Sequence, residues 1–131
     1  MHSRTMLRVL AGSLLVISSG GCMTAVAAGA GAGAALAYDD RGVSTRMEGT
    51  VDGVFARAQT VFREMGITET AQDNDGDERE LQGRAGNDLE VTVDIEAETA
   101  SMVSVSVYAQ RNTVNWDREY ARSVLQRIMA R

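Results

Sequence analysis

Side chains that act as nucleophiles, general bases or metal ligands are scarce in this 131-residue sequence. There is one cysteine, Cys22, and one histidine, His2, and the chain has no lysine. Because nucleophilic catalysis, acid–base catalysis and zinc binding most often use these residue types, we expect no enzyme, no metal site and no cofactor. A lone cysteine forms no internal disulfide. The chemistry left to Cys22 is covalent modification of its thiol.

The segment before Cys22 has the three parts of a bacterial secretory signal. Arginines supply the positive charge, an apolar run covers 9–17, and small residues at 18–21 lead into the cysteine. This last part resembles the lipobox of bacterial lipoproteins, in which the thiol receives a diacylglyceryl group and the signal is cut just before it. Ser19 departs from the aliphatic residue usual at its position. The resemblance implies a signal peptide at 1–21 and lipidation of Cys22.

Two other fates of this segment remain open. A signal peptidase could cut later, after Ala35-Leu36-Ala37, and remove an unmodified Cys22. Alternatively, the uncharged stretch 9–38 could stay as a membrane helix. Glycine and alanine dominate its second half, which makes it a poor lipid-facing helix. We favour lipidation because acyl chains on Cys22 would anchor the protein without any transmembrane segment.

Residues 22–37 hold the cysteine and a Gly/Ala-rich stretch of low complexity, which we expect to be a tether. As a flexible coil it would span roughly 20 Å. Gly29 and Gly33 match the Gly-x-x-x-Gly pattern of packed membrane helices, but such a match is nearly automatic among so many small residues. Met23 follows the cysteine, where lipoproteins retained at the inner membrane carry aspartate. The resemblance therefore implies an outer-membrane lipoprotein facing the periplasm.

The charge balance argues against nucleic acid as a partner. The chain has 13 basic and 18 acidic residues, a net charge of −5, and removal of Arg4 and Arg8 with the signal leaves 11 against 18, or −7. The expected partners are the membrane, through the lipid, and an envelope protein.

Hydrophobic periodicity predicts one α+β domain at 38–131. Alternating apolar and polar residues predict strands at 42–48, 67–72, 79–84, 89–98 and 102–110. Three-and-four spacing predicts helices at 51–65, between Thr50 as cap and Gly66, and at 115–130, with Asn115 as cap. The expected fold is a two-layer sandwich, an antiparallel sheet of four to five strands with both helices on one face, in the order β-α-β-β-β-β-α.

Two acidic features raise the question of cation binding. The run 73–78 has acids at the first, third and fifth positions of an EF-hand loop, but Glu78 stands at the sixth and Arg84 at the twelfth, where glycine and glutamate belong. We favour a hairpin turn on Asp75-Gly76. A second feature is the acidic ladder, formed by Glu90, Asp94, Glu96 and Glu98. We interpret it as a solvated sheet face.

A protein partner could bind the sheet face or the loop before the last helix, where the candidate contacts are Arg111, Asn112 and Trp116. Trp116, the only tryptophan, could anchor a ligand. We favour the interpretation that it seals the core at the edge of the sheet.

The whole pattern resembles the small bacterial lipoprotein family catalogued as domain of unknown function number 3568. The shared features are the leader with cysteine, the Gly-Ala repeat before Tyr38, Arg41-Gly42 opening a strand, the helix end at 64–67, paired valine-rich strands, and a last helix ending at 124–128. The loop 110–116 departs from the glycine-containing turn expected there. The resemblance implies a periplasm-facing lipoprotein without assigned activity.

Together these observations predict a structural or protein-interaction module tethered by Cys22. The alternative is a lipoprotein that binds a small ligand or a divalent cation. An enzyme would have to rely on carboxylates, serines or tyrosines.

The intact mass of the protein extracted from membranes tests the anchor. We expect a chain that starts at Cys22 and carries added lipid mass, and we expect Cys22→Ser to lack that mass. An unmodified chain starting at Tyr38 would contradict lipidation.

Overall fold

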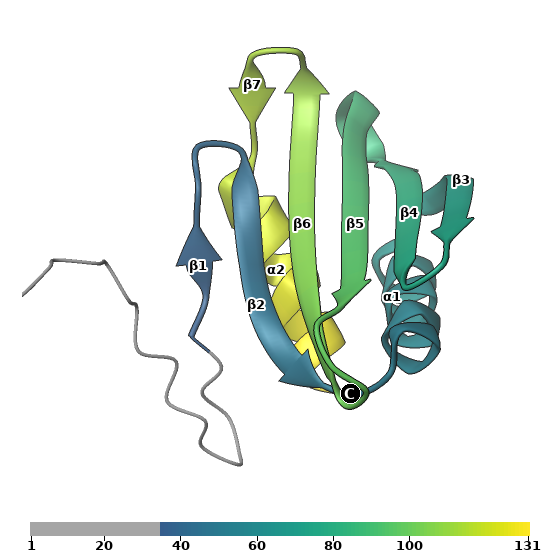
Figure 1. Cartoon of the computed structure of the whole chain (residues 1–131). Helices are drawn as coiled ribbons and strands as arrows, with labels where there is room; N and C mark the ends of the chain where they lie inside the picture. The colour runs from purple at the N-terminus through teal and green to yellow at the C-terminus, as the bar shows by residue number, and fades with distance from the viewer. Residues whose placement is uncertain (1–34) are drawn as a thin grey trace, which may run out of the picture.

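The computed structural model describes residues 35–131, so the expected signal peptide and Cys22 lie outside the described residues. Figure 1 shows one sheet with two helices behind it. The elements in chain order are β1 (Ala37–Tyr38), β2 (Gly42–Glu48), α1 (Val51–Met65), β3 (Thr68–Asp75), β4 (Glu78–Ala85), the short 3₁₀ helix η1 (Gly86–Asp88), β5 (Leu89–Ala97), β6 (Met102–Asn112), β7 (Asn115–Trp116) and α2 (Arg118–Met129). Neither α1 nor α2 is long and apolar enough to cross a bilayer.

The sheet is antiparallel, with strands in the spatial order β1-β2-β6-β5-β4-β3, and β7 pairs with β6. Both helices pack on the same face and touch each other (Figure 1). The predicted two-layer α+β sandwich is therefore confirmed, and its five long strands follow the predicted order. Two strands of two residues each, β1 and β7, extend the sheet beyond the prediction.

The core lies between the helices and the inward side of the sheet. Along β5 and β6 every second side chain is buried, as a sheet with one covered face requires. The largest fully buried side chains are Phe62, Leu81, Ile95, Leu125 and Ile128. Burial of such side chains contributes about 1.5–3 kcal/mol each and holds the layers together.

Helix α1 begins and ends where the sequence predicts. The Thr50 side chain accepts a hydrogen bond from the Gly53 amide at 3.1 Å, which satisfies a donor that the first turn leaves free. Gly66 takes the left-handed conformation with φ 69°, which other residues adopt at a cost, and its amide donates back to the last turn.

The start of α2 differs from the prediction, because Asn115 is not its cap. The Asn112 side chain accepts hydrogen bonds from the amides of Val114 and Asn115, at 3.1 and 3.0 Å, and turns the chain back along β6. Asn115 and the residue after it therefore form β7. Asp117 caps the helix instead, accepting from the Tyr120 amide at 3.0 Å.

The two edges of the sheet are built differently. At one edge β1 covers β2, and Leu36 packs against the core, so residues 35–37 of the expected tether take part in the fold. At the other edge β3 is exposed along its whole length. Its pairing with β4 shifts register between Glu69 and Ala71, which leaves Thr70 as a bulge.

Replacement of Leu125 by alanine tests the core. Leu125 on α2 is fully buried, so Leu125→Ala should lower the free energy of unfolding by about 2–5 kcal/mol in urea denaturation. The neighbouring Gln126 is exposed, and Gln126→Ala should change it by less than about 0.5 kcal/mol. Equal effects of the two substitutions would contradict the assignment of this helix face to the core.

Candidate functional site

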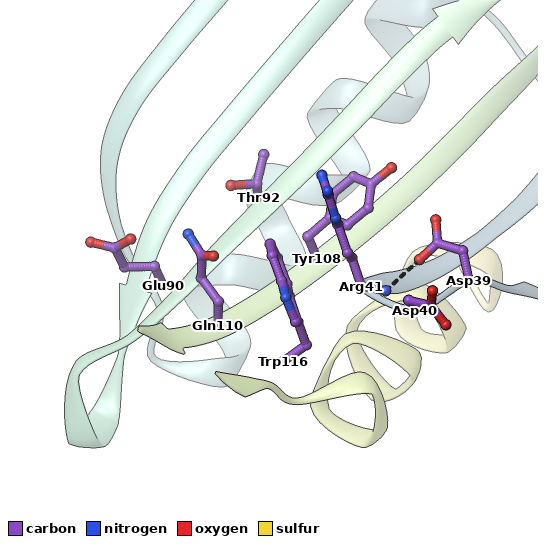
Figure 2. A pocket seen from close by; sticks show the side chains of 8 residues that line it. All are labelled: Asp39, Asp40, Arg41, Glu90, Thr92, Tyr108, Gln110 and Trp116. Carbon is purple, nitrogen blue, oxygen red and sulfur yellow. Dashed lines mark hydrogen bonds between the residues drawn. The ribbon is translucent and has the colours of Figure 1, made fainter. Parts of the chain in front are cut away.

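The face of the sheet opposite the helices is not covered by any element between residues 35 and 131 (Figure 1). It carries the outward side chains of the long strands, which are mostly polar. At one end of this face lies a hollow of about 460 Å³, which we call the Trp116 hollow. Its lining residues, drawn in Figure 2, are Asp39, Asp40, Arg41, Glu90, Thr92, Tyr108, Gln110 and Trp116.

Two aromatic rings form the apolar part of the Trp116 hollow. The rings of Tyr108 and Trp116 meet edge to face, with centroids 6.4 Å apart and an angle of 70° between their planes. Tyr108 stands opposite Gly42 of β2, and a Cβ at that glycine would come within 2.6 Å of the tyrosine ring. The missing side chain of Gly42 is therefore what lets the tyrosine ring lie across the neighbouring strand.

The loop between β1 and β2 brings a cation to the aromatic pair. Asp39 Oδ1 accepts hydrogen bonds from the amides of Arg41 and Gly42, at 2.7 and 2.6 Å, and so fixes the loop. The Arg41 guanidinium carbon lies 5.9 Å from the centroid of the Trp116 ring, a cation–π distance (Figure 2). A hydrogen-bonded turn thus aims an arginine at the only tryptophan.

The position of Trp116 corrects the expectation that it seals the core. Trp116 pairs with Gln110, an outward residue of β6, and its side chain lies on the open face with that of Gln110 (Figure 2). The inward side of this region is closed by the apolar stripe of α2 instead. The side chains of that stripe are Ala121, Val124, Leu125 and Ile128.

A second hollow, of about 640 Å³, is also lined by Trp116 and contains most of the predicted partner contact. We call it the arginine hollow, and its other lining residues are Tyr38, Arg111, Asn115, Asp117, Arg118, Glu119 and Arg122. Arg111 and Trp116, both predicted, line it together. Asn112 does not line it, because its side chain oxygen holds the β6–β7 turn.

The arginines of the arginine hollow differ in whether a carboxylate pairs with them. Arg111 pairs with Asp117 at 3.4 Å and Arg122 with Glu119 at 2.9 Å. Arg118 donates to the backbone carbonyl oxygen of Asp39 at 3.3 Å and has no carboxylate partner among the residues described. Its charge is therefore the least neutralised of the three.

The acidic ladder lies on the open face, with one crowded carboxylate. Asp94 stands opposite Glu80 of β4, and its Oδ1 is buried without a hydrogen-bond partner among residues 35–131. The pKa of Asp94 is raised to about 6, first by burial and then by the negative charges of Glu80 and Glu78. Within 35–131 no group of three or more acidic, histidine or cysteine residues is placed to hold a metal ion.

The acidic run at 73–78 forms a hairpin between β3 and β4. Asp75 pairs with Glu78, so the two-residue loop is Gly76-Asp77, one residue later than predicted. Gly76 has φ 54°, a conformation that favours glycine and explains the placement. Asp73 and Asp75 lie on strand β3 instead of a cation-binding loop.

The crowding of Asp94 predicts a pH dependence of stability. Its folded-state pKa of about 6 lies above its usual value of 3.8, so the ionised form destabilises the folded state. The domain should therefore gain stability as the pH falls through 6, with the gain complete near 3.8. Asp94→Asn should raise the melting temperature at about pH 7.5, and its advantage over the wild type should shrink by about pH 5.

The matched control is Glu96→Gln, which removes one charge from the same face of β5 at an exposed position. Its melting temperature should follow that of the wild type across the same pH range. An advantage of Asp94→Asn that persists undiminished at low pH would contradict the assigned burial of the Asp94 carboxylate.

Comparison with known proteins places this chain in a family. No curated protein matches the sequence. A family model described as "Protein of unknown function (DUF3568)" matches residues 5–130, which is nearly the whole chain. This match confirms the family, domain of unknown function number 3568, that the sequence resembled. The chain belongs to the DUF3568 family.

Proposed function

We propose that this protein is a lipoprotein of the bacterial cell envelope, anchored through Cys22 to the outer membrane on its periplasmic side, and that it binds an envelope protein without catalysing a reaction. The lipobox-like sequence before Cys22 supports the anchor. The observation that carries the binding role is the β6–β7 turn, which projects beyond the sheet next to the arginine hollow (Figure 1).

The β6–β7 turn combines features of protein interfaces. Val114 at its tip is 79% exposed, although a hairpin tip is usually polar. Tyr38, which lines the arginine hollow, is 53% exposed. These two are the large hydrophobic side chains left exposed between residues 35 and 131. Tyrosine and arginine are enriched where proteins meet, because they combine apolar area with hydrogen bonding.

Charge indicates the chemistry of the partner. Three arginines, Arg111, Arg118 and Arg122, line one hollow with Asp117 and Glu119, in a chain whose net charge is −5. Within the described part of the chain, only Arg111 and Arg122 are paired with carboxylates. The partner surface we propose therefore has an apolar pocket for Val114 and a carboxylate that meets Arg118.

The alternative role, binding of a small ligand, has its own support in the Trp116 hollow. Divalent cations lack such support, because no set of three suitable ligands comes together in the described part of the chain. The linings of the two hollows have only Trp116 in common, so a small-ligand role and protein binding use largely different side chains.

Photo-cross-linking in cells tests the protein partner. A photoreactive amino acid at position 114 should yield a cross-linked species of higher mass, whereas the same group at the exposed Gln126 should not. Adding Arg118→Glu should reduce the yield at position 114 because it would repel the partner's carboxylate. Cross-linking at 114 no stronger than at 126 would contradict the proposal.

A further inference from the structure

The side chains of the Trp116 hollow retain hydrogen-bonding capacity that the domain does not use. The hydroxyls of Thr92 and Tyr108, the Gln110 amide and the Trp116 indole N–H make no side-chain hydrogen bond to another described residue. The residues are half-buried. Their polar atoms stay open to water, so a ligand can hydrogen-bond to them by replacing bound water. Polar groups of both donor and acceptor type are thus gathered beside two aromatic rings.

The charges around the Trp116 hollow largely cancel. Of its three carboxylates, Asp39 is engaged by backbone amides and Glu90 pairs with Arg84 at 3.2 Å. Arg41 places a positive charge inside the hollow and has no carboxylate within ion-pair distance in the described residues. With two arginines offsetting most of three carboxylates, the hollow is matched neither to a strong anion nor to a strong cation. A neutral polar ligand fits it better.

The arrangement of the rings limits further which neutral ligands can bind. Figure 2 shows the indole edge-on, with Arg41 and Tyr108 on one side and Gln110 and Glu90 on the other. Arg41 occupies the first side at cation–π distance, which leaves the side toward Gln110 for a ligand. A ligand there would need an apolar face for the ring and hydroxyl or amide groups at its rim.

We propose that the Trp116 hollow binds a saccharide. One sugar ring packs its C–H face against the Trp116 indole, and its hydroxyls exchange hydrogen bonds with Gln110, Thr92 and the carboxylate of Glu90. The planar amide and carboxylate groups suit neighbouring hydroxyls, because each offers two polar atoms side by side. The volume of about 460 Å³ lies within the ~300–1,000 Å³ of small-ligand sites. The open face lets a longer glycan continue past the hollow.

The proposal does not depend on the protein partner, whose contacts lie at the β6–β7 turn and the arginine hollow. It assigns a second binding role to the open face. The two roles share only Trp116, which lines both hollows. Gln110 and Thr92 belong to the saccharide site alone.

Trp116 is itself the reporter for the test, because the chain has no other tryptophan. The full-length protein in detergent is titrated with an oligosaccharide of N-acetylglucosamine and with one of glucose. We expect at least one of them to change the indole fluorescence with saturation. Gln110→Ala and Thr92→Val should each weaken binding about fivefold, the effect of about one lost hydrogen bond. Ser104→Ala, on the same face of β6 outside the hollow, should bind like the wild type.

Two further arms complete the experiment. In the first arm, the protein is sedimented with insoluble cell-wall glycan. Cosedimentation that the soluble sugar prevents identifies the natural ligand as wall glycan. Binding of the soluble sugar without cosedimentation identifies it as a free saccharide. Melting curves of each variant establish that it is folded. The proposal is overturned if neither oligosaccharide gives a saturable change, or if Gln110→Ala and Thr92→Val bind as tightly as Ser104→Ala.

Discussion

The pairing of β5 with β6 sets the position of every other element. Val93 pairs with Val107 and Ile95 with Val105, so the apolar side chains of both strands share one face. Because side chains alternate along a strand, a slip of one residue would turn that entire apolar set toward solvent. Both helices rest on this face. The same register also fixes the opposite face, where Thr92 stands opposite Tyr108 at the floor of the Trp116 hollow.

Most of the fold is encoded by periodicity that extends over many residues. The elements β2, α1, β5 and β6 repeat their patterns over seven or more residues, and each begins at the residue that the sequence predicts. Strand β3 is exposed along its whole length, has no such alternation and ends at Asp75 instead of residue 72. A two-residue strand such as β7 has no period to detect. Trp116 and Tyr120 are spaced as on one helical face, and Asn115 is a good cap, so the sequence favours an early helix start. The turn held by Asn112 overrides both signals.

The Trp116 hollow could not be assembled from the sequence for a different reason. Arg41, Thr92 and Trp116 come from three separate segments, and only the register of β6 with both β2 and β5 brings these segments together. Arg111 and Trp116 were predictable as candidates because a polar loop with an aromatic residue is a common contact. Trp116 also lines the Trp116 hollow, which Arg111 does not, because β7 pairs Trp116 with Gln110 and so turns the indole toward the open face.

The proposed lipid anchor would bring copies of this protein together at high local density on a membrane, and the free edge of β3 then has a consequence. An uncovered strand can recruit the same strand of another copy and begin strand-by-strand polymerisation. The bulge at Thr70 interrupts the row of backbone groups, and Glu69, Asp73 and Asp75 on this strand would bring like charges together. Copies at high local density would therefore not associate through β3 and would stay monomeric. The open face of each sheet would then be free to bind a ligand.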